Sequence, residues 1–457
     1  MPRYEFSEGS SNKFWEITLH KKTFTTTYGK TGTAGQSASK SWPSEAEAKK
    51  QHDKLIAEKE KKGYVLVGGS AAPKAASKAS AKATPAPAPL ATPRNPSLEK
   101  AIFDNPEAVE GYEAYGAWLK TQGDPLAELI AIQTGLSKNR EDKALKKKER
   151  EFLAKHEDAL LGGLAKCKAE GDLQLYWRNG FIESVILGSD EGNPDQAPPE
   201  ACYEMLVGCT AARFLHSLSF WAFDDEEGQP SYQKLLTQLE KLGTPPTLRH
   251  LTFDVREYQV SWTKLGNLHK LYPQLQKLES LSLHVGELNL GEIDLPSLRR
   301  LEIKTGGFTK KNLKSVVEAS LPSLTSMILY FGTDEYGCDC KAKDVKAFID
   351  SIKAPKLTRL GLCNSEFEDE FPAMLAASKL LPKLKHLELS MGTLSDEGAQ
   401  VLLDEKRAFA HLESINLEQN YLSEMMRERL RVAFERIILT EQGDHDDDED
   451  RYVQIAE

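Results

Sequence analysis

The N-terminal part of the chain alternates aromatic or β-branched residues with polar ones. Residues 12–19, Asn-Lys-Phe-Trp-Glu-Ile-Thr-Leu, and residues 25–37 both show this period of two, which predicts half-buried antiparallel strands. Glycines at positions 29, 32 and 35 predict a turn at the end of the second run. A helix is predicted after Pro43, because Ser44 and Glu47 form a capping box and Gly63 suits a C-terminal cap.

A second pattern, apolar-x-x-apolar-x-apolar, recurs from residue 182 onward. About nine copies are present: Ile182/Val185/Leu187, Leu215/Leu218/Phe220, Leu248/Leu251/Phe253, Leu278/Leu281/Leu283, Leu298/Leu301/Ile303, Leu324/Met327/Leu329, Leu357/Leu360/Leu362, Leu384/Leu387/Leu389 and Leu412/Ile415/Leu417. Their spacing is roughly 20 to 33 residues, typical of a stacked repeat protein. The last two apolar positions of each copy lie two apart and point to one side of a short strand. Stacked copies would therefore bury a ladder of apolar residues.

The remaining segments differ from both patterns. Residues 68–95 are mostly Ala, Ser, Lys and Pro, which predicts a linker without a packed core. Residues 97–164 have helical spacing interrupted by a turn at Gly123-Asp124-Pro125, which predicts a helical cap. The chain ends in an acidic run at 444–450, for which disorder is expected. The predicted parts are thus residues 1–66, a linker at 67–96, a helical module at 97–170, repeats at 171–436 and an acidic tail at 437–457.

The N-terminal motifs resemble a known domain. An Asn-Lys-Phe-Trp strand, then Tyr28-Gly29-Lys30-x-Gly-x-x-Gly-Gln, then a lysine-rich helix, is similar to the WGR domain, whose Trp-Gly-Arg corresponds here to Tyr28-Gly29-Lys30. The resemblance implies a small antiparallel sheet with a helix. In the poly(ADP-ribose) polymerases this domain helps to engage DNA ends, and several bacterial proteins carry it without a catalytic domain. Lys30 is a compact point charge, so it cannot reproduce the bidentate contacts of the family's arginine.

The repeats resemble the ribonuclease-inhibitor type of leucine-rich repeat, because helical sequence such as residues 394–403 lies between the strands. This implies a strand on the concave side and a helix on the convex side of each repeat. The family's asparagine after the third apolar position is present at Asn420 alone. Residues 115–130 are similar to a helical module that precedes leucine-rich repeats in large bacterial proteins, especially of myxobacterial type. The expected fold is therefore multi-domain α/β: a WGR-like sheet with a helix, a disordered linker, a helical cap and an α/β leucine-rich repeat solenoid.

Composition and charge narrow the class of protein. The chain has 457 residues, 28% charged residues and six cysteines, and it has no apolar run near the ~18 residues needed to span a bilayer. We therefore expect a cytoplasmic location and no membrane partner. Residues 1–100 contain 17 Lys and Arg but 9 Asp and Glu, a charge of +8, which leaves −18 for the rest of the chain. Either the N-terminal part approaches phosphate or its lysines only keep the surface solvated.

Motifs for catalysis or metal binding are not found. The sequence has no H-E-x-x-H, nucleophile-elbow or phosphate-loop pattern. Cys338 and Cys340, with Cys363 later, lack the paired spacing of a zinc site. Cys363 follows Leu362 at a strand end and is better explained as a small buried residue. The acidic run at 444–450 lacks the central glycine of a calcium loop. We expect no enzymatic activity, no cofactor and no metal.

One candidate surface is the WGR-like loop. It combines cations with an aromatic ring, as contact with a nucleic-acid backbone requires. Its members are Lys13, Lys21, Lys22, Tyr28, Lys30, Gln36 and Lys40. Equally, Tyr28 would pack inside the sheet while Gly29 only turns the chain, and both interpretations stay open.

The other candidate surface is the concave face of the repeats, at the positions between the apolar residues of each strand. These are Ser219, Thr252, Ser282, Glu302, Ile328, Gly361, Glu388 and Asn416. The first hypothesis is a non-enzymatic adaptor: the repeats recognise a protein partner, and the WGR-like domain supplies a second contact, with DNA as its candidate ligand. The alternative is a DNA-end or nick-binding regulator with the WGR-like domain as its main site.

Overall fold

The chain folds into two compact units, Met1–Pro85 and Ala86–Glu457. The computed structural model describes residues 3–8, 11–30, 36–41, 49–50, 52, 55–56, 59, 65–68, 93–188, 197–221, 223–224, 230–256, 259–443 and 451–455. Each unit has a hydrophobic core of its own. Most of the linker predicted at residues 67–96 lies outside the described residues.

The N-terminal unit contains a five-stranded antiparallel sheet with strand order β4-β3-β2-β1-β5. Its strands are β1 (Arg3–Glu8), β2 (Ser11–His20), β3 (Thr23–Lys30), β4 (Gln36–Ser41) and β5 (Val65–Gly68). Residues 49, 50, 52, 55, 56 and 59 are helical. The buried core consists of Tyr4, Trp15 and Ile17, against which Leu19, Leu55 and Ile56 pack. The predicted antiparallel strands are confirmed, and so is the helix where the structure describes it.

The second unit begins with a helical segment. Its helices are α2 (Pro96–Asp104), α3 (Val109–Thr121), α4 (Leu126–Lys138), α5 (Lys143–Leu161) and α6 (Leu164–Glu170). The predicted turn between α3 and α4 is confirmed, since the Asp124 carboxylate accepts a hydrogen bond from the Leu126 N–H at 2.8 Å. Aromatic rings join this segment to the sheet that follows, with Phe181 and Phe214 edge to face at 4.6 Å. Tyr115 packs against both rings.

The main sheet of this unit has 11 strands in the order β20-β19-β18-β17-β16-β15-β13-β11-β8-β7-β6. Neighbouring strands are parallel, except that β6 and β7 form an antiparallel pair. The strands are β6 (Leu173–Arg178), β7 (Phe181–Leu187), β8 (Ser217–Trp221), β11 (His250–Asp254), β13 (Ser280–His284), β15 (Arg300–Lys304), β16 (Ser326–Gly332), β17 (Arg359–Ser365), β18 (His386–Glu388), β19 (Ser414–Asn416) and β20 (Ile437–Ile438).

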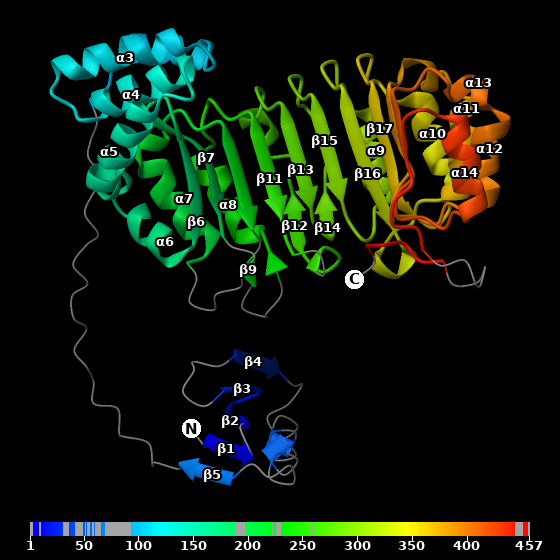
Figure 1. Ribbon diagram of the computed structural model, residues 1–457, viewed down its shortest axis with the longest axis horizontal. Helices are drawn as coiled ribbons and strands as arrows, with labels where there is room; N and C mark the ends of the chain where they lie inside the picture. The colour runs from blue at the N-terminus through cyan, green and yellow to red at the C-terminus, as the bar shows by residue number, and fades with distance from the viewer. Residues whose placement is uncertain are drawn as a thin grey trace. The chain divides into compact units, whose positions relative to one another are not determined.

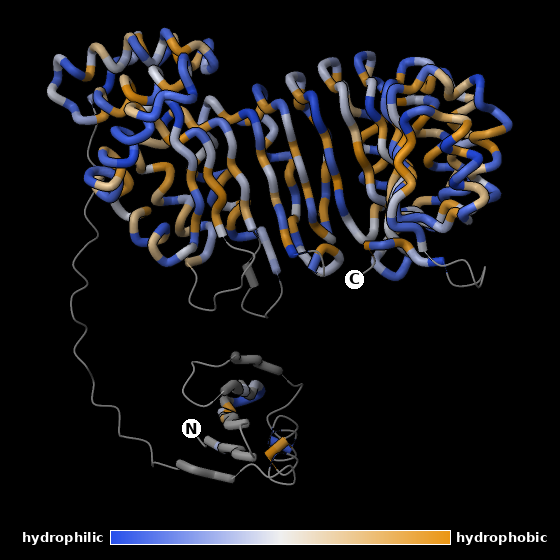
Figure 2. Tube along the Cα trace, viewed as in Figure 1, coloured by the Kyte–Doolittle hydropathy of each residue, from blue (hydrophilic) through white to orange (hydrophobic). Residues whose placement is uncertain are grey.

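Each apolar copy predicted from the sequence contributes one strand of this sheet, from β7 to β19. The middle apolar residues of the copies are direct register partners from strand to strand: Val185, Leu218, Leu251, Leu281, Leu301, Met327, Leu360, Leu387 and Ile415. All are buried in one continuous core. Hydrophobic and hydrophilic residues alternate along the strands (Figure 2), because side chains on a strand point to opposite faces in turn.

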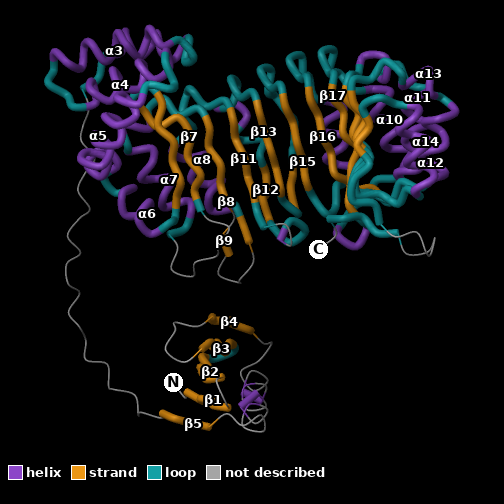
Figure 3. Tube along the Cα trace, in the orientation of Figure 1, coloured by secondary structure: helices purple, strands orange, loops and turns teal. Residues whose placement is uncertain are grey.

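Helices line one face of the main sheet, and no described helix covers the middle of the other face (Figure 1, Figure 3). They are α7 (Pro199–Gly208), α8 (Gln233–Leu242), α9 (Lys310–Glu318), α10 (Ala342–Ser351), α11 (Phe371–Ala376), α12 (Asp396–Asp404), α13 (Lys406–Phe409) and α14 (Glu424–Ala433). Short 3-10 turns also occur: η1 (Thr210–Ala212), η3 (Tyr272–Gln274), η4 (Asp334–Tyr336), η5 (Glu368–Glu370) and η6 (Leu381–Lys383).

Between β11 and β15, the chain returns through short strands instead of the helices expected from the resemblance. A second sheet has the order β14-β12-β10-β9, with strands β9 (Phe223–Asp224), β10 (Pro230–Ser231), β12 (Lys264–Asn267) and β14 (Glu287–Asn289). After Leu281, the next copy begins at Leu298, which leaves too few residues for a helix and two loops. An extended segment covers the distance back to the next strand of the main sheet with fewer residues than a helix does.

The C-terminal end of the fold extends beyond the boundary expected at residue 436. Phe434, Ile437 and Leu439 repeat the apolar pattern once more, and β20 pairs with β19. Residues 451–455 also lie on the folded unit, where Val453 and Ile455 are buried. The acidic run at 444–450 lies outside the described residues.

Candidate functional site

The candidate site of the second unit is the face of the main sheet opposite its helices, here called the helix-free face. The predicted positions form one unbroken row across eight neighbouring strands, each residue being the direct register partner of the next. This middle row is Ser219, Thr252, Ser282, Glu302, Ile328, Gly361, Glu388 and Asn416. All but Gly361 are partly exposed. The structure therefore brings all eight predicted positions together on one surface.

One apolar contact interrupts this polar row. A Cβ atom on Gly361 would lie 2.7 Å from Cγ2 of Ile328, so only glycine leaves room for the neighbouring isoleucine. Ile328 is partly exposed, and Gly361 is buried beneath it. The middle of the helix-free face thus presents an aliphatic side chain between Glu302 and Glu388.

The row two residues earlier on each strand, here called the first row, carries hydroxyl and basic side chains. This first row is Ser184, Ser217, His250, Ser280, Arg300, Ser326, Arg359, His386 and Ser414. The Arg359 Nη2 atom lies 3.1 Å from Glu388 Oε2 in the middle row. Burial lowers the pKa of His250. The face therefore has cations along one side and carboxylates toward its centre.

A third row, two residues later, contains a charged histidine that sequence reasoning missed. His284 Nδ1 lies 2.9 Å from Asp254 Oδ1, and His284 Nε2 lies 3.7 Å from Glu302 Oε1. Burial opposes protonation of His284, but its contacts with Asp254 and Glu302 outweigh this and raise its pKa to about 9. The strand period would have located this residue, because His284 follows Ser282 of the middle row by two positions.

Replacing His284 by glutamine should flatten the pH dependence of stability. The pKa of about 9 in the folded chain exceeds the ordinary histidine value, so this contribution is fully present below about pH 6.5 and is lost as the pH rises through 9. We expect His284→Gln to lower the free energy of unfolding near pH 6.5 by about 1–3 kcal/mol and much less above pH 9. Urea denaturation across this range measures the difference, with exposed His269→Gln as the control. Equal losses at both ends of the range would refute a charged His284.

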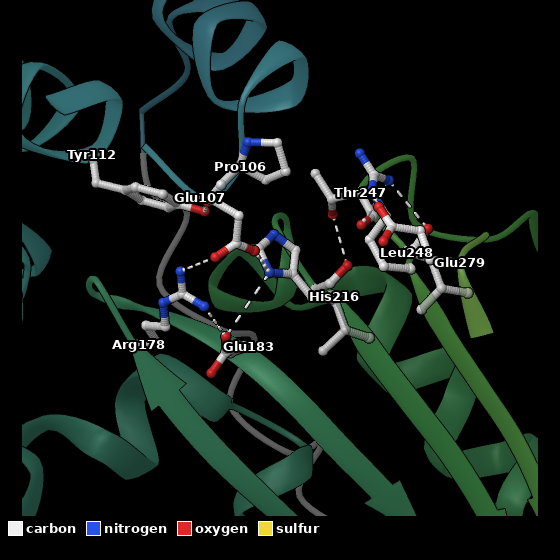
Figure 4. Close-up of polar contacts among 11 residues, drawn as sticks. Pro106, Glu107, Tyr112, Arg178, Glu183, His216, Thr247, Leu248 and Glu279 are labelled. Atoms are coloured by element: carbon white, nitrogen blue, oxygen red, sulfur yellow. Dashed lines mark hydrogen bonds and ion pairs between the residues drawn. The ribbon is translucent and has the colours of Figure 1, made fainter. Parts of the chain in front are cut away.

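An anchor of charged residues bounds the helix-free face at its helical end (Figure 4). The Arg178 guanidinium on β6 lies 2.6 Å from Glu107 Oε2, in the loop between α2 and α3, and also pairs with Glu183 on β7. The Nδ1 atom of His216 is 3.8 Å from Glu107 Oε1. Burial lowers the pKa of His216 despite these carboxylates. The cluster holds the helical segment against the start of the strands.

The cysteines do not form a metal centre in the described part of the chain. All six cysteines are unpaired and buried, including Cys338, Cys340 and Cys363. No group of three or more His, Cys, Asp or Glu residues suited to a metal ion occurs among the residues that the structure describes. None of the described helices is long and apolar enough to cross a membrane.

In the N-terminal unit, the strand register divides the predicted set into two groups. Lys13 pairs with Lys30, and Tyr28 is the partner of both Trp15 and Gln36, so these positions lie at one end of the sheet. The other predicted residues lie toward the opposite end: Lys21 and Lys22 in the exposed turn after β2, and Lys40 on β4 opposite Phe24. From Lys13 on β2 to Lys21 just after it, the chain takes eight residue steps, a span of about 26 Å. One small ligand cannot contact both groups.

Comparison with known families identifies this unit. The model of the WGR domain family matches residues 3–70. Residues 3–70 form a WGR domain. Within it, Tyr28-Gly29-Lys30 lies at the end of β3, next to the segment that leads to β4. The register partner of Tyr28 in β2 is the buried Trp15, so the aromatic position of the motif lies directly beside the core of the WGR domain.

The chain as a whole is similar in fold to a solved structure. A crystal structure of a Bacteroides fragilis protein, a target of the Northeast Structural Genomics Consortium, superimposes with a TM-score of 0.53. The alignment covers 100% of this chain and 99% of that chain at 20% sequence identity. At this identity the likeness concerns the fold alone. No curated protein matches the sequence.

Proposed function

We propose that the protein is a non-enzymatic adaptor, in which a leucine-rich repeat solenoid binds a protein partner and the WGR domain supplies a second contact. The observation that carries this proposal is the middle row, eight side-chain positions in unbroken register on a face that no described helix covers. The buried Asn420 supports the repeat type, because its side chain bonds the backbone of adjacent copies. In such a solenoid the helix-free face is the concave side.

The charges of the face favour a protein as the ligand of the repeats. Basic side chains of the first and third rows lie beside carboxylates of the middle row, as in the pairs Arg359 with Glu388 and His284 with Glu302. The chain beyond residue 100 has a formal charge of −18, which would repel a phosphate backbone. A mixed pattern around the partly exposed Ile328 suits a partner surface with an apolar centre and charges of both signs.

The second contact would be made by the WGR domain with nucleic acid. Residues 1–100 carry a charge of +8, and the register brings Lys13 beside Lys30. Phosphate neutralisation needs such neighbouring cations. In the alternative function, a DNA-end or nick-binding regulator, this contact would be the main one and the repeats would only couple it to other factors.

The two functions are separated by testing both surfaces in the full-length chain. We expect the double substitution Glu302→Lys with Glu388→Lys to reduce recovery of a protein partner at least about 10-fold, whereas Glu318→Lys on exposed α9 leaves it unchanged. We expect Tyr28→Ala with Lys30→Ala to weaken binding to nicked duplex and to lower the salt slope by about 1. If the double substitution at Glu302 and Glu388 leaves partner recovery unchanged, the adaptor function is excluded. Binding to nicked duplex that does not change with salt would exclude the DNA contact.

A further inference from the structure

The C-terminal segment, residues 451–455, lies across the ends of three strands of the main sheet. At β17, the Asn364 amide donates to the Ile455 carbonyl and accepts from the Ile455 N–H, both at 2.8 Å. At the end of β18, the Met391 carbonyl accepts from the Gln454 N–H at 3.0 Å. Near β19, the Tyr421 hydroxyl accepts from the Tyr452 N–H at 2.9 Å and donates to its carbonyl at 3.0 Å.

The surface that contacts this segment, formed by Asn364, Met391, Tyr421 and Asp369, is here called the groove. The side chains of the segment alternate between buried and exposed. Val453 is 5% exposed and Ile455 is 1% exposed, whereas Tyr452 is 66% exposed. At the start of the segment, Arg451 Nη1 lies 3.0 Å from Asp369 Oδ2 and donates to the Thr393 carbonyl at 2.8 Å. The groove therefore has three subsites at a spacing of two residues, one for a cation and two for aliphatic side chains.

The groove wall includes backbone conformations that ordinary residues seldom adopt. Asn364 has φ +55 and Met391 has φ +65, both in the left-handed region. Such positions are uncommon for residues other than glycine and often occur at binding sites. Their own N–H groups still bond the neighbouring copy. The Asn364 N–H donates to the Ser390 carbonyl, and the Met391 N–H donates to the Glu418 carbonyl. This leaves the Asn364 side chain and the Met391 carbonyl to bond the segment.

From these contacts we propose that the groove recognises a protein segment of the pattern Arg-x-aliphatic-x-aliphatic, and that residues 451–455 are its resident occupant. Recognition relies on hydrogen bonds to the backbone of the segment and on burial of alternate side chains. A partner segment with the same pattern would displace the occupant. This site lies at the strand ends and is separate from the helix-free face, so it goes beyond the function proposed above.

Displacement is feasible because the occupant is short and lies outside the strands of the main sheet. Its attachment consists of two buried aliphatic side chains, a partly exposed ion pair and a few hydrogen bonds, and the entropy of ordering five residues opposes it. It ends the described chain, so its release breaks no strand of the main sheet. A competing segment needs only a modest advantage in affinity or local concentration.

A synthetic peptide tests this proposal directly. A fluorescein-labelled peptide with the sequence of residues 449–457 is titrated by anisotropy against the full-length chain, a chain that ends at residue 450, and the full-length double variant Val453→Lys with Ile455→Lys. We expect the two altered chains to bind the peptide at least about 10-fold more tightly than the unaltered chain, because their grooves are vacant. A peptide with Ile455→Lys should lose binding, whereas one with Gln454→Lys, at an exposed position, should retain it.

Three results would overturn the proposal. The first is equal affinity of the peptide, including none, for the unaltered and altered chains. The second is loss of folded structure, seen by circular dichroism, in both altered chains, because the segment would then be a structural part and not an occupant. The third is a full-length dimer that becomes monomeric when residues 451–457 are removed, because the segment would then belong to a second copy.

Discussion

Alanine in place of Glu99 is expected to lower the free energy of unfolding of the unit Ala86–Glu457 by about 3–5 kcal/mol. The Glu99 side chain is 1% exposed, and its Oε1 lies 2.9 Å from Arg213 Nη1, whose side chain is 9% exposed. Arg94 and the Tyr115 hydroxyl bond the same carboxylate. Removing it leaves the Arg213 charge buried without its main counter-charge, and a charge in that condition is costly.

This ion pair joins the helical segment to the main sheet. Glu99 lies on α2 and Arg213 lies just before β8, 114 residues later in the chain. Burial opposes ionisation of Glu99, but bonds from Arg94 and Arg213 outweigh it and lower its pKa. The stabilisation is therefore present above the ordinary carboxylate pKa and is lost as the pH falls through the lower folded value.

Urea denaturation near pH 7 measures the loss. The matched control is Glu141→Ala, because Glu141 pairs with Lys146 at 3.3 Å but is 89% exposed, and exposed pairs contribute little. The double variant Glu99→Ala with Arg213→Ala should cost less than the sum of the single variants, since the second change removes the unpaired charge. If Glu99→Ala costs no more than the control, the network does not hold the helical segment in place.

Alanine in place of Asn420 should lower the free energy of unfolding by about 2–4 kcal/mol, because it leaves several buried backbone groups without partners. The Asn420 Oδ1 atom accepts from the Leu394 N–H at 3.1 Å, and its Nδ2 atom donates to the carbonyls of Leu389 at 2.8 Å and Leu417 at 3.2 Å. Asn420 is fully buried, so water cannot replace these bonds.

The matched control for Asn420→Ala is Asn416→Ala, on β19 of the helix-free face. The Asn416 side chain bonds Glu418 and is partly exposed, so water can take over its hydrogen bonds. We expect a loss below about 1 kcal/mol for this control. Urea denaturation compares the free energies of unfolding of the two variants through their midpoints, provided that both unfold with the same dependence on urea concentration. Similar losses would mean that Asn420 does not hold adjacent copies together.

The strands of the main sheet were predictable because the same spacing of apolar residues recurs along the chain. Each copy places apolar residues two apart, and stacking the copies without register slips makes the middle row follow automatically. Asn420 was also evident, since it follows the third apolar position of its copy. The WGR domain was recognisable from local spacing alone, because its strands and turn are consecutive in sequence.

Features that depend on contacts between distant segments were not predicted. The Asp254, His284 and Glu302 cluster joins three strands, and the Glu107, Arg178 and His216 cluster joins a helical loop to the sheet. The last copy, which includes Ile437, falls within the expected tail, because a single short apolar run next to an acidic segment is a weak signal. In residues 451–455, an alternation of two aliphatic side chains does not reveal the groove that receives them.

The sequence by itself determined the two units, the strand of each repeat copy and the row of residues on the helix-free face. These follow from periodicity, which acts within a strand and is copied from one repeat to the next. The tertiary structure alone decided the charge of His284, the division of the lysines of the WGR domain between two ends of its sheet, and the docking of the C-terminal segment. Each of these depends on which distant groups come close enough to form an ion pair, share a ligand or bury a side chain. The periodicity of the sequence carries no information about contacts between distant groups.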